Sequence, residues 1–205
     1  GHLAAFSFHE TKNIISGEGG MLAINDMQFA KRAEIIWEKG TNRSSFFRGE
    51  VDKYGWVDVG SSFLPSEIIS AFLWAQLENI QDIQERRRTI WNTYYYRLKS
   101  RIEKHGVKMP FVPNYASNNA HMFYILAKDS KQRNEIIKFL KSLEVQTVFH
   151  YLSLHKSPFY DKKYDGGDLK NADFYSECLI RLPFFYELNQ EMQDLVINSL
   201  ISYFD

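Results

Sequence analysis

Cysteine is almost absent from this sequence. Its 205 residues contain one cysteine, Cys178, so a disulfide framework is excluded and a reducing compartment, the cytoplasm, is expected. Cys178 stands in the apolar run Cys178-Leu179-Ile180. This setting favours a small buried hydrophobic residue over a reactive thiol.

A charge imbalance and long apolar runs are absent as well. The 25 basic residues equal the 25 acidic ones, so the chain has no overall field that would recruit nucleic acid or a membrane. A local cluster of cations can still bind a phosphorylated ligand. No stretch approaches the ~20 apolar residues of a membrane span, and no internal repeat or low-complexity tract is present.

The N-terminus has neither an initiator methionine nor the basic and apolar regions of a signal peptide. Instead, the apolar run from Leu3 to Phe8 predicts a buried strand that begins at once. We therefore expect the chain to start inside a domain and to be part of a longer protein.

What the sequence does have is enough apolar material for a core, with 44% hydrophobic and 16% aromatic residues. Alternation, helical spacing and capping residues predict a mixed α and β chain. We expect the Trp and Tyr residues between positions 90 and 102 to pack in the core. Strands are expected over residues 3–9, 21–24, 122–127, 145–151 and 180–183, and helices over 29–37, from 65 to 102 (one bent helix or two), after Ser130, over 173–178 and after Asn189.

One lysine follows the first strand closely. Lys12 lies five residues after Ser7 and shortly before the glycines of Gly17-Glu18-Gly19-Gly20. Desolvation next to a buried strand would lower the pKa of the amine, and a neutral amine can attack an aldehyde. The serine hydroxyl could donate to a phosphate, and the glycines allow a tight turn or the close approach of a ligand. The alternative is an ordinary solvated lysine.

Residues 41–60 lack any lasting periodicity, which in a compact protein is more often functional than idle. The segment mixes cations with aromatic rings, including Arg43, Arg48, Lys53 and Tyr54. Guanidinium groups bind diphosphates in bidentate fashion, so this loop could clamp a nucleotide-sugar. A solvated charged loop is the alternative.

The order of several motifs resembles the DegT/DnrJ/EryC1/StrS sugar aminotransferases, and the likeness extends along the whole chain. Within that family it resembles the branch that converts dTDP-4-oxo-6-deoxyglucose to dTDP-4-amino-4,6-dideoxygalactose for surface polysaccharides such as enterobacterial common antigen or lipopolysaccharide. The motifs are Phe6-Ser-Phe-His-Glu-Thr-Lys-Asn, Gly17-Glu-Gly-Gly, Lys39-Gly-Thr-Asn-Arg-Ser, Phe47-Arg-Gly, Val51-Asp-Lys-Tyr, Asp58-Val-Gly-Ser-Ser, Ala120-His-Met-Phe-Tyr and Val148-Phe-His-Tyr-Leu-Ser-Leu-His.

The resemblance implies an α/β fold, that of fold-type-I enzymes of pyridoxal 5′-phosphate (PLP), similar to aspartate aminotransferase. This chain would be its C-terminal portion: residues 1–64 the remnant of the PLP-binding large domain with a substrate loop, and residues 65–205 the connecting helices and a small α+β domain. Lys12 would bind PLP covalently and act as the catalytic base, and Ser7 would donate to the cofactor phosphate. Ser62 replaces the family's Asn at a second phosphate contact, and Leu64 replaces its Arg.

The resemblance also implies residues that contact the substrates. These are His9, Arg43, Arg48, Lys53, Tyr54, His150, Tyr151 and His155. Two histidines five residues apart do not by themselves make a metal site, and no metal is expected. His9 could equally be a packed histidine at a strand end. The residues that would pair with the pyridine nitrogen and stack on the ring belong to the upstream half of the family's fold.

The implied reaction transfers an amino group from glutamate to C4 of the dTDP-sugar, in a homodimer with a shared active site and with no nucleic-acid or membrane partner. We expect these 205 residues alone to be inactive. Two alternatives remain. A PLP-dependent sugar dehydratase is disfavoured, because such enzymes carry His where Lys12 stands. An inactive fragment or a non-catalytic interaction module of the same fold is the other alternative.

Overall fold

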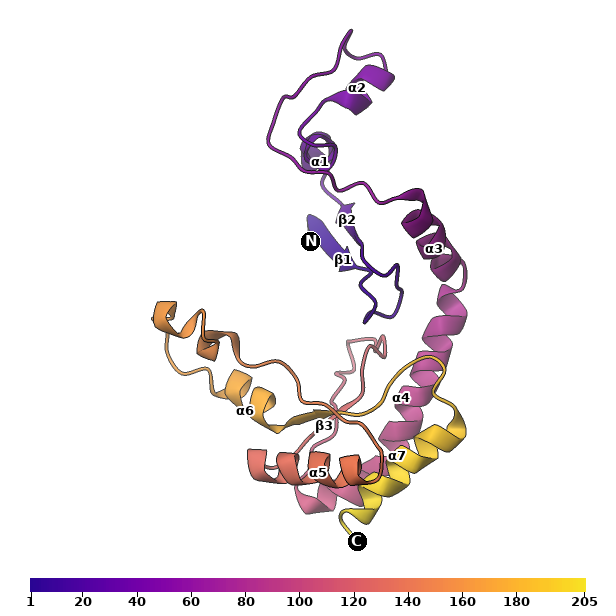
Figure 1. Cartoon of the computed structure of the whole chain (residues 1–205), viewed down its shortest axis with the longest axis vertical. Helices are drawn as coiled ribbons and strands as arrows, with labels where there is room; N and C mark the ends of the chain where they lie inside the picture. Colours follow the sequence, from indigo (N-terminus) through magenta and orange to yellow (C-terminus); the bar gives the residue numbers. More distant parts are fainter. The chain divides into compact units, whose positions relative to one another are not determined.

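The computed structural model describes all 205 residues and divides them into two compact units, Gly1–Ile80 and Gln81–Asp205 (Figure 1). The sequence suggested a domain boundary nearer the N-terminus, between residues 64 and 65. The helix that begins after Pro65 therefore belongs to the first unit. The division falls where this helix ends and the next one begins.

The first unit opens with a two-stranded antiparallel sheet. Strand β1 (Leu3–Ser7) pairs with β2 (Gly20–Ile24), in a register that sets Leu3 opposite Ile24 and Ser7 opposite Gly20. The prediction that β1 is buried is wrong, because all five of its residues are exposed. A strand becomes buried only when another layer covers its face, and this sheet consists of β1 and β2 alone.

Two short helices follow the hairpin. After the 3₁₀ turn η1 (Met27–Phe29), capped by Asp26, comes helix α1 (Ala30–Trp37). Gly40, at φ 78°, turns the chain away from α1, and its N–H donates to the carbonyl of Ile35 at 2.8 Å. Helix α2 (Arg43–Phe47) lies inside the segment that was expected to be irregular.

The long helical stretch is two helices, α3 (Glu67–Glu78) and α4 (Ile80–Ile102). Ser66 caps the start of α3 by accepting a hydrogen bond from the N–H of Ile69, as a Pro-Ser-Glu start predicts. Asn79 separates the two helices, and its side chain donates to the carbonyl of Ala75 at 2.8 Å.

The second unit contains a small antiparallel sheet of two strands, β3 (Tyr124–Leu126) and β4 (Leu179–Arg181), in which Tyr124 lies opposite Arg181. The expected strand over 145–151 is reduced to one bridge, between Val148 and Arg181. The N-cap of α5 is Asp129, one residue before the Ser130 that the sequence suggested. After α4 the elements are η2 (Glu103–His105), β3 (Tyr124–Leu126), α5 (Ser130–Ser142), η3 (Leu154–Lys156), η4 (Asp161–Lys163), α6 (Lys170–Cys178), β4 (Leu179–Arg181) and α7 (Gln190–Ser202).

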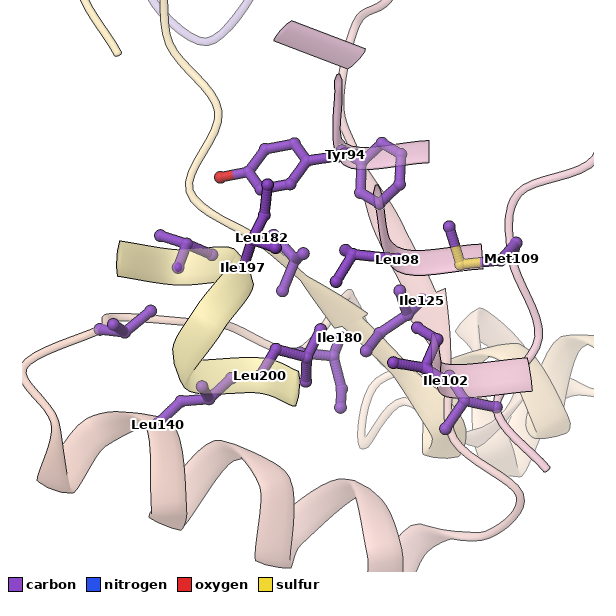
Figure 2. Close-up of a cluster of buried hydrophobic side chains, with 14 of the residues drawn as sticks. Tyr94, Leu98, Ile102, Met109, Ile125, Leu140, Ile180, Leu182, Ile197 and Leu200 are labelled. Carbon is purple, nitrogen blue, oxygen red and sulfur yellow. The ribbon is translucent and has the colours of Figure 1, made fainter. Parts of the chain in front are cut away.

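The core of the second unit is built on one stripe of α4. Ile90, Tyr94, Leu98 and Ile102 recur every four residues and are fully buried against β3, β4, α5 and α7 (Figure 2). The hydroxyl of Tyr94 donates to the carbonyl of Pro183 at 2.9 Å. Trp91 is also buried and Tyr95 packs against the cluster, so the core prediction is confirmed for Trp91, Tyr94 and Tyr95, whereas Tyr96 is exposed.

The two units differ in how much they bury. Phe8 is the one buried hydrophobic residue of the first unit, whereas Cys178 and all the others belong to the second. Neither α4 nor any other helix is long and apolar enough to cross a membrane.

Candidate active site

Lys12 lies in a tight turn directly after β1. Its backbone N–H donates to the carbonyl of His9 at 2.9 Å, and the N–H of Glu10 donates to the carbonyl of Gly17 at the same distance. Although β1 is exposed, Lys12 is half-buried and Ser16 is buried. The turn, and not a buried strand as predicted, therefore shields Lys12 in part from solvent.

Ser7 is joined to the same turn. Its Oγ accepts a hydrogen bond from the N–H of His9 at 3.4 Å, while His9 in turn accepts from Lys12 through its carbonyl. The hydroxyl proton of Ser7 is left for another acceptor, and the side chain is exposed. A hydroxyl donor and a lysine amine held in one turn fit a cofactor that carries both a phosphate and an aldehyde.

The ring of His9 is oriented by two neighbours. The N–H of Thr11 donates to Nδ1 at 3.2 Å, so Nδ1 is an acceptor and the neutral ring carries its proton on Nε2. Nε2 lies 3.5 Å from a carboxylate oxygen of Glu18. His9 therefore braces the turn, and its expected contact with a substrate stays a prediction.

The glycines of the motif serve the turn. Gly19 has φ 157°, and a Cβ there would lie 2.6 Å from the hydroxyl of Ser16, which donates to the carbonyl of Glu18 at 2.8 Å. The close approach that Gly19 allows is thus to Ser16 of the same turn, which fits the tight turn among the roles expected of these glycines.

The loop of residues 41–60 is closed at its base. Asn42 and Gly55 bond reciprocally: the N–H of Gly55 donates to the Asn42 side chain at 2.7 Å, and the N–H of Asn42 donates to the Gly55 carbonyl at 3.2 Å. A Cβ on Gly40 would collide with the carbonyl of Asp58, and one on Gly60 would collide with the backbone of Gly40. The two ends of the loop thus touch through residues without side chains.

Arg48, expected to bind a substrate, is paired with two carboxylates. Its Nη1 and Nη2 donate to both oxygens of Glu34 at 2.8 and 3.0 Å, and its Nε donates to Glu50 at 2.6 Å. Hydrogen bonding to Glu34 and then to Glu50 raises the pKa of Arg48, and the bond from Arg48 is the main cause of the lowered pKa of Glu50. Arg48 therefore anchors the loop.

The other loop residues that were expected to bind a substrate, Arg43, Lys53 and Tyr54, are exposed. The guanidinium of Arg43 lies 5.1 Å from the ring centre of Phe47, which is 69% exposed. Tyr54 is exposed, with its ring 5.7 Å from that of Phe46. Lys53 is exposed on the same loop.

Ser62, the expected second phosphate contact, lies just after the loop. It forms a backbone bridge with Glu38 at the end of α1, and its side chain is exposed. An exposed serine hydroxyl beside the base of the loop is available to donate to a ligand.

In the second unit, His150 lies next to a cation. Its Nδ1 is buried without a hydrogen-bond partner, and its ring is 5.0 Å from that of the exposed Tyr151. Burial, and then the positive charge of Arg181, lower the pKa of His150. The imidazole is therefore kept neutral beside an arginine.

His155 belongs to a separate cluster. Its side chain is only 10% exposed and its Nε2 lies 3.2 Å from the carboxylate of Asp173. Lys156 contacts the other oxygen of Asp173 at 2.8 Å, which is the main reason that the pKa of Asp173 is lowered. In this structure His155 ties η3 to α6.

The acidic partners of these residues were not among the predicted site residues. Glu34, Glu50 and Asp173 each pair with a side chain expected at the site. No local signal marks two of these pairs, because Glu34 lies 14 residues before Arg48 and Asp173 lies 18 residues after His155.

Solved structures share this fold. The structure of S. venezuelae DesV in complex with a ketimine intermediate superposes with a TM-score of 0.86 at 23% identity, over 99% of this chain and 52% of its own. A DegT DnrJ EryC1 StrS aminotransferase from Brucella abortus gives a TM-score of 0.83 at 25% identity, over 99% of this chain and 51% of its own. The fold is that of the PLP-dependent sugar aminotransferases.

The family itself is shown by the sequence. The chain belongs to the DegT/DnrJ/EryC1/StrS aminotransferase family, whose profile matches residues 1–201. Aminotransferases of this family depend on PLP. The spore coat polysaccharide biosynthesis protein SpsC of Bacillus subtilis is 28% identical over 98% of this chain and 53% of its own length. The chain spans about half the length of the curated relatives it matches.

Proposed function

We propose that this chain supplies the cofactor lysine and the C-terminal half of an enzyme that aminates a nucleotide-linked sugar. The amino group would pass from glutamate to C4 of a 4-keto-6-deoxy sugar, converting dTDP-4-oxo-6-deoxyglucose to dTDP-4-amino-4,6-dideoxygalactose for surface polysaccharide. The observation that carries the proposal is the turn that joins Ser7, His9 and Lys12, in a chain of this family.

In this proposal, Lys12 holds the cofactor and moves protons. When bound, PLP supplies an electron-withdrawing ring that stabilises negative charge beside the transferred nitrogen. The amine of Lys12, once displaced by glutamate, takes the proton from the glutamate α-carbon, and in the second half-reaction it delivers a proton to C4 of the sugar. Glutamate leaves as 2-oxoglutarate, and the sugar keeps the amino group.

The remaining residues would bind and orient. The hydroxyl of Ser7, and that of Ser62 in a partner subunit's site, would donate to the cofactor phosphate. Arg43, Lys53 and Tyr54 would meet the nucleotide diphosphate, since their loop is cationic, aromatic and exposed. We propose that His9, in the turn of the first unit, contacts a substrate. For the second unit, we propose separately that the segment with His150, Tyr151 and His155 contacts a substrate. A homodimer with a shared site is part of the proposal.

The Lys12→Ala variant of the full-length protein tests the catalytic assignment. It should lose both the visible absorbance of lysine-bound PLP and the transamination of glutamate, because no other amine of the turn can replace Nζ. Absorbance spectra and 2-oxoglutarate release are the measurements. The matched control is Lys31→Ala, an exposed lysine on α1, which should keep both signals. Normal turnover by Lys12→Ala would refute the assignment.

A non-catalytic role is the second candidate, because the chain spans only about half of its relatives. For residues 1–205 alone we expect neither firm PLP binding nor transamination, since half of the family's fold is not among them. Firm PLP binding by this chain alone would show that it carries the cofactor site by itself. A panel of dTDP- and UDP-sugars offered to the full-length enzyme would identify the substrate.

A further inference from the structure

Helix α2 is attached to α1 by two side-chain contacts, one at each end. At its start, the hydroxyl of Ser44 donates to the carboxylate of Glu38 at 2.8 Å. At its end, Arg48 forms the paired bonds to Glu34 at 2.8 and 3.0 Å. Glu38 and Arg48 are the C-cap residues of α1 and α2, four residues after Glu34 and Ser44, so both contacts join the same sides of the two helices.

The guanidinium of Arg48 has no free pair of N–H groups with which to bind a phosphate in bidentate fashion, because only one N–H, on Nη1, lacks a partner within the chain. Each of its nitrogens donates to a carboxylate, and Nη2 also lies 3.4 Å from the hydroxyl of Ser45. Glu34 and Glu50 together carry two negative charges against the one positive charge of Arg48. A diphosphate that approached Arg48 would have to displace a carboxylate to form a bidentate contact, and it would meet the repulsion of both carboxylates.

Helix α2 and the loop after it also carry a cation and aromatic rings that are exposed to solvent. Arg43 lies over the exposed ring of Phe47, and Phe46 lies against both Phe47 and Tyr54. None of these rings takes part in the hydrogen bonds that Ser44 and Arg48 form with Glu38 and Glu34. A cation beside exposed aromatic rings suits a nucleoside diphosphate, because the rings can stack on the base and the guanidinium can pair with the phosphates.

We propose that Arg48 is a positioning residue: with Glu34 and Glu50 it fixes α2 so that Arg43 and the aromatic rings can receive the nucleotide part of the substrate. This inference rests on the proposed function and assigns diphosphate binding to Arg43 instead of Arg48. It also predicts that an acidic residue, Glu34, is needed to bind an anionic ligand.

Calorimetric titration of the full-length protein with dTDP, and with UDP in parallel, tests the inference. Arg48→Gln and Glu34→Gln should each weaken binding by roughly three- to tenfold, as expected for the loss of a well-formed ion pair. The double variant should be no weaker than either single one, because both changes release the same helix. Arg43→Gln should weaken binding directly.

Two further measurements separate positioning from general damage. Arg48→Gln should raise the KM for the nucleotide-sugar while the half-reaction with glutamate keeps its rate. Ser44→Ala, which opens the other contact without changing any charge, should weaken dTDP binding in the same direction. Melting temperatures identify variants that fail to fold, and Arg101→Gln, an exposed arginine on α4, is the matched control that should change nothing.

The outcome for Glu34→Gln decides between the two roles of Arg48. Unchanged or tighter dTDP binding in this variant, combined with weaker binding in Arg48→Gln, would show that Arg48 itself holds the phosphates and would overturn the inference. A wild-type enzyme that transaminates but binds neither nucleotide would overturn it as well. A wild type without PLP absorbance would instead refute the proposed function.

Discussion

At the residue scale, the two histidines expected at the site have different surroundings. The largely buried side chain of His155 lies beside the carboxylate of Asp173, whereas His150 experiences the positive charge of Arg181. The positive charge of the Arg181 guanidinium disfavours an imidazolium at His150. The two histidines of the His-Tyr-Leu-Ser-Leu-His segment look equivalent in the sequence, but they lie near groups of opposite charge.

This difference predicts how His150 titrates. Burial is the first cause of its lowered pKa and Arg181 the second, so Arg181→Gln should raise the pKa of His150 only part of the way towards its usual value of about 6.5. An NMR titration of the ring protons measures this. Arg133→Gln, on α5, is the comparison variant and should leave that titration in place.

The same shift has a consequence for stability. Because the folded state binds this proton less readily than the unfolded state, the contribution of His150 is present above about pH 6.5 and is lost as the pH falls through its lowered folded value. His150→Gln should flatten this part of the stability profile. A profile that keeps its slope in the variant would show that another group causes it.

At the element scale, α4 shows how far spacing alone can predict packing. Its residues at positions 90, 94, 98 and 102 are fully buried, while Tyr96 on the same helix is 75% exposed. The spacing of four places the buried residues on one stripe without any knowledge of the partner elements. The cap of α7, Asn189, was predicted for the same reason, because a cap acts within the first turn of its own helix.

Two substitutions on this helix should differ strongly. Leu98→Ala should destabilise the second unit by about 2–5 kcal/mol, since it leaves a cavity in a fully buried cluster. Tyr96→Ala should change stability by roughly 0.5 kcal/mol or less. Urea unfolding of both variants is the measurement. Equal losses would mean that α4 does not pack through the stripe described here.

The segment 145–151 shows where element prediction failed. Its apolar residues have strand propensity, but only Val148 pairs with β4. Strand formation depends on a neighbouring strand that offers a continuous row of donors and acceptors, and β4 is only three residues long. Such pairing is a property of the tertiary structure and is not visible in the segment itself.

At the scale of the whole molecule, the hydrophobic core is unequally divided. The second unit contains the whole buried cluster, whereas the first unit buries one hydrophobic side chain, Phe8. A two-stranded hairpin without a covering layer is marginal in water. The predicted site residues of the first unit therefore lie in the unit that has almost no hydrophobic core.

This distribution predicts how the two parts behave when separated. Residues 81–205 alone should unfold cooperatively on heating, because their core is complete, and residues 1–80 alone should show no sharp transition. Calorimetry on the two separate polypeptides measures both. A cooperative transition in residues 1–80 would mean that their exposed apolar surface collapses into a core of its own.

The sequence by itself determined the family, the turn with its lysine, and the helices whose stripes and caps repeat within a few residues. Those features depend on neighbours along the chain, so they can be recognised in it. Only the tertiary structure decided that β1 is exposed, that Arg48 is held by Glu34 and Glu50, and that His155 is paired with Asp173. Burial and ion pairing depend on which elements meet in space, and residues 14 or 18 positions apart carry no local mark of it.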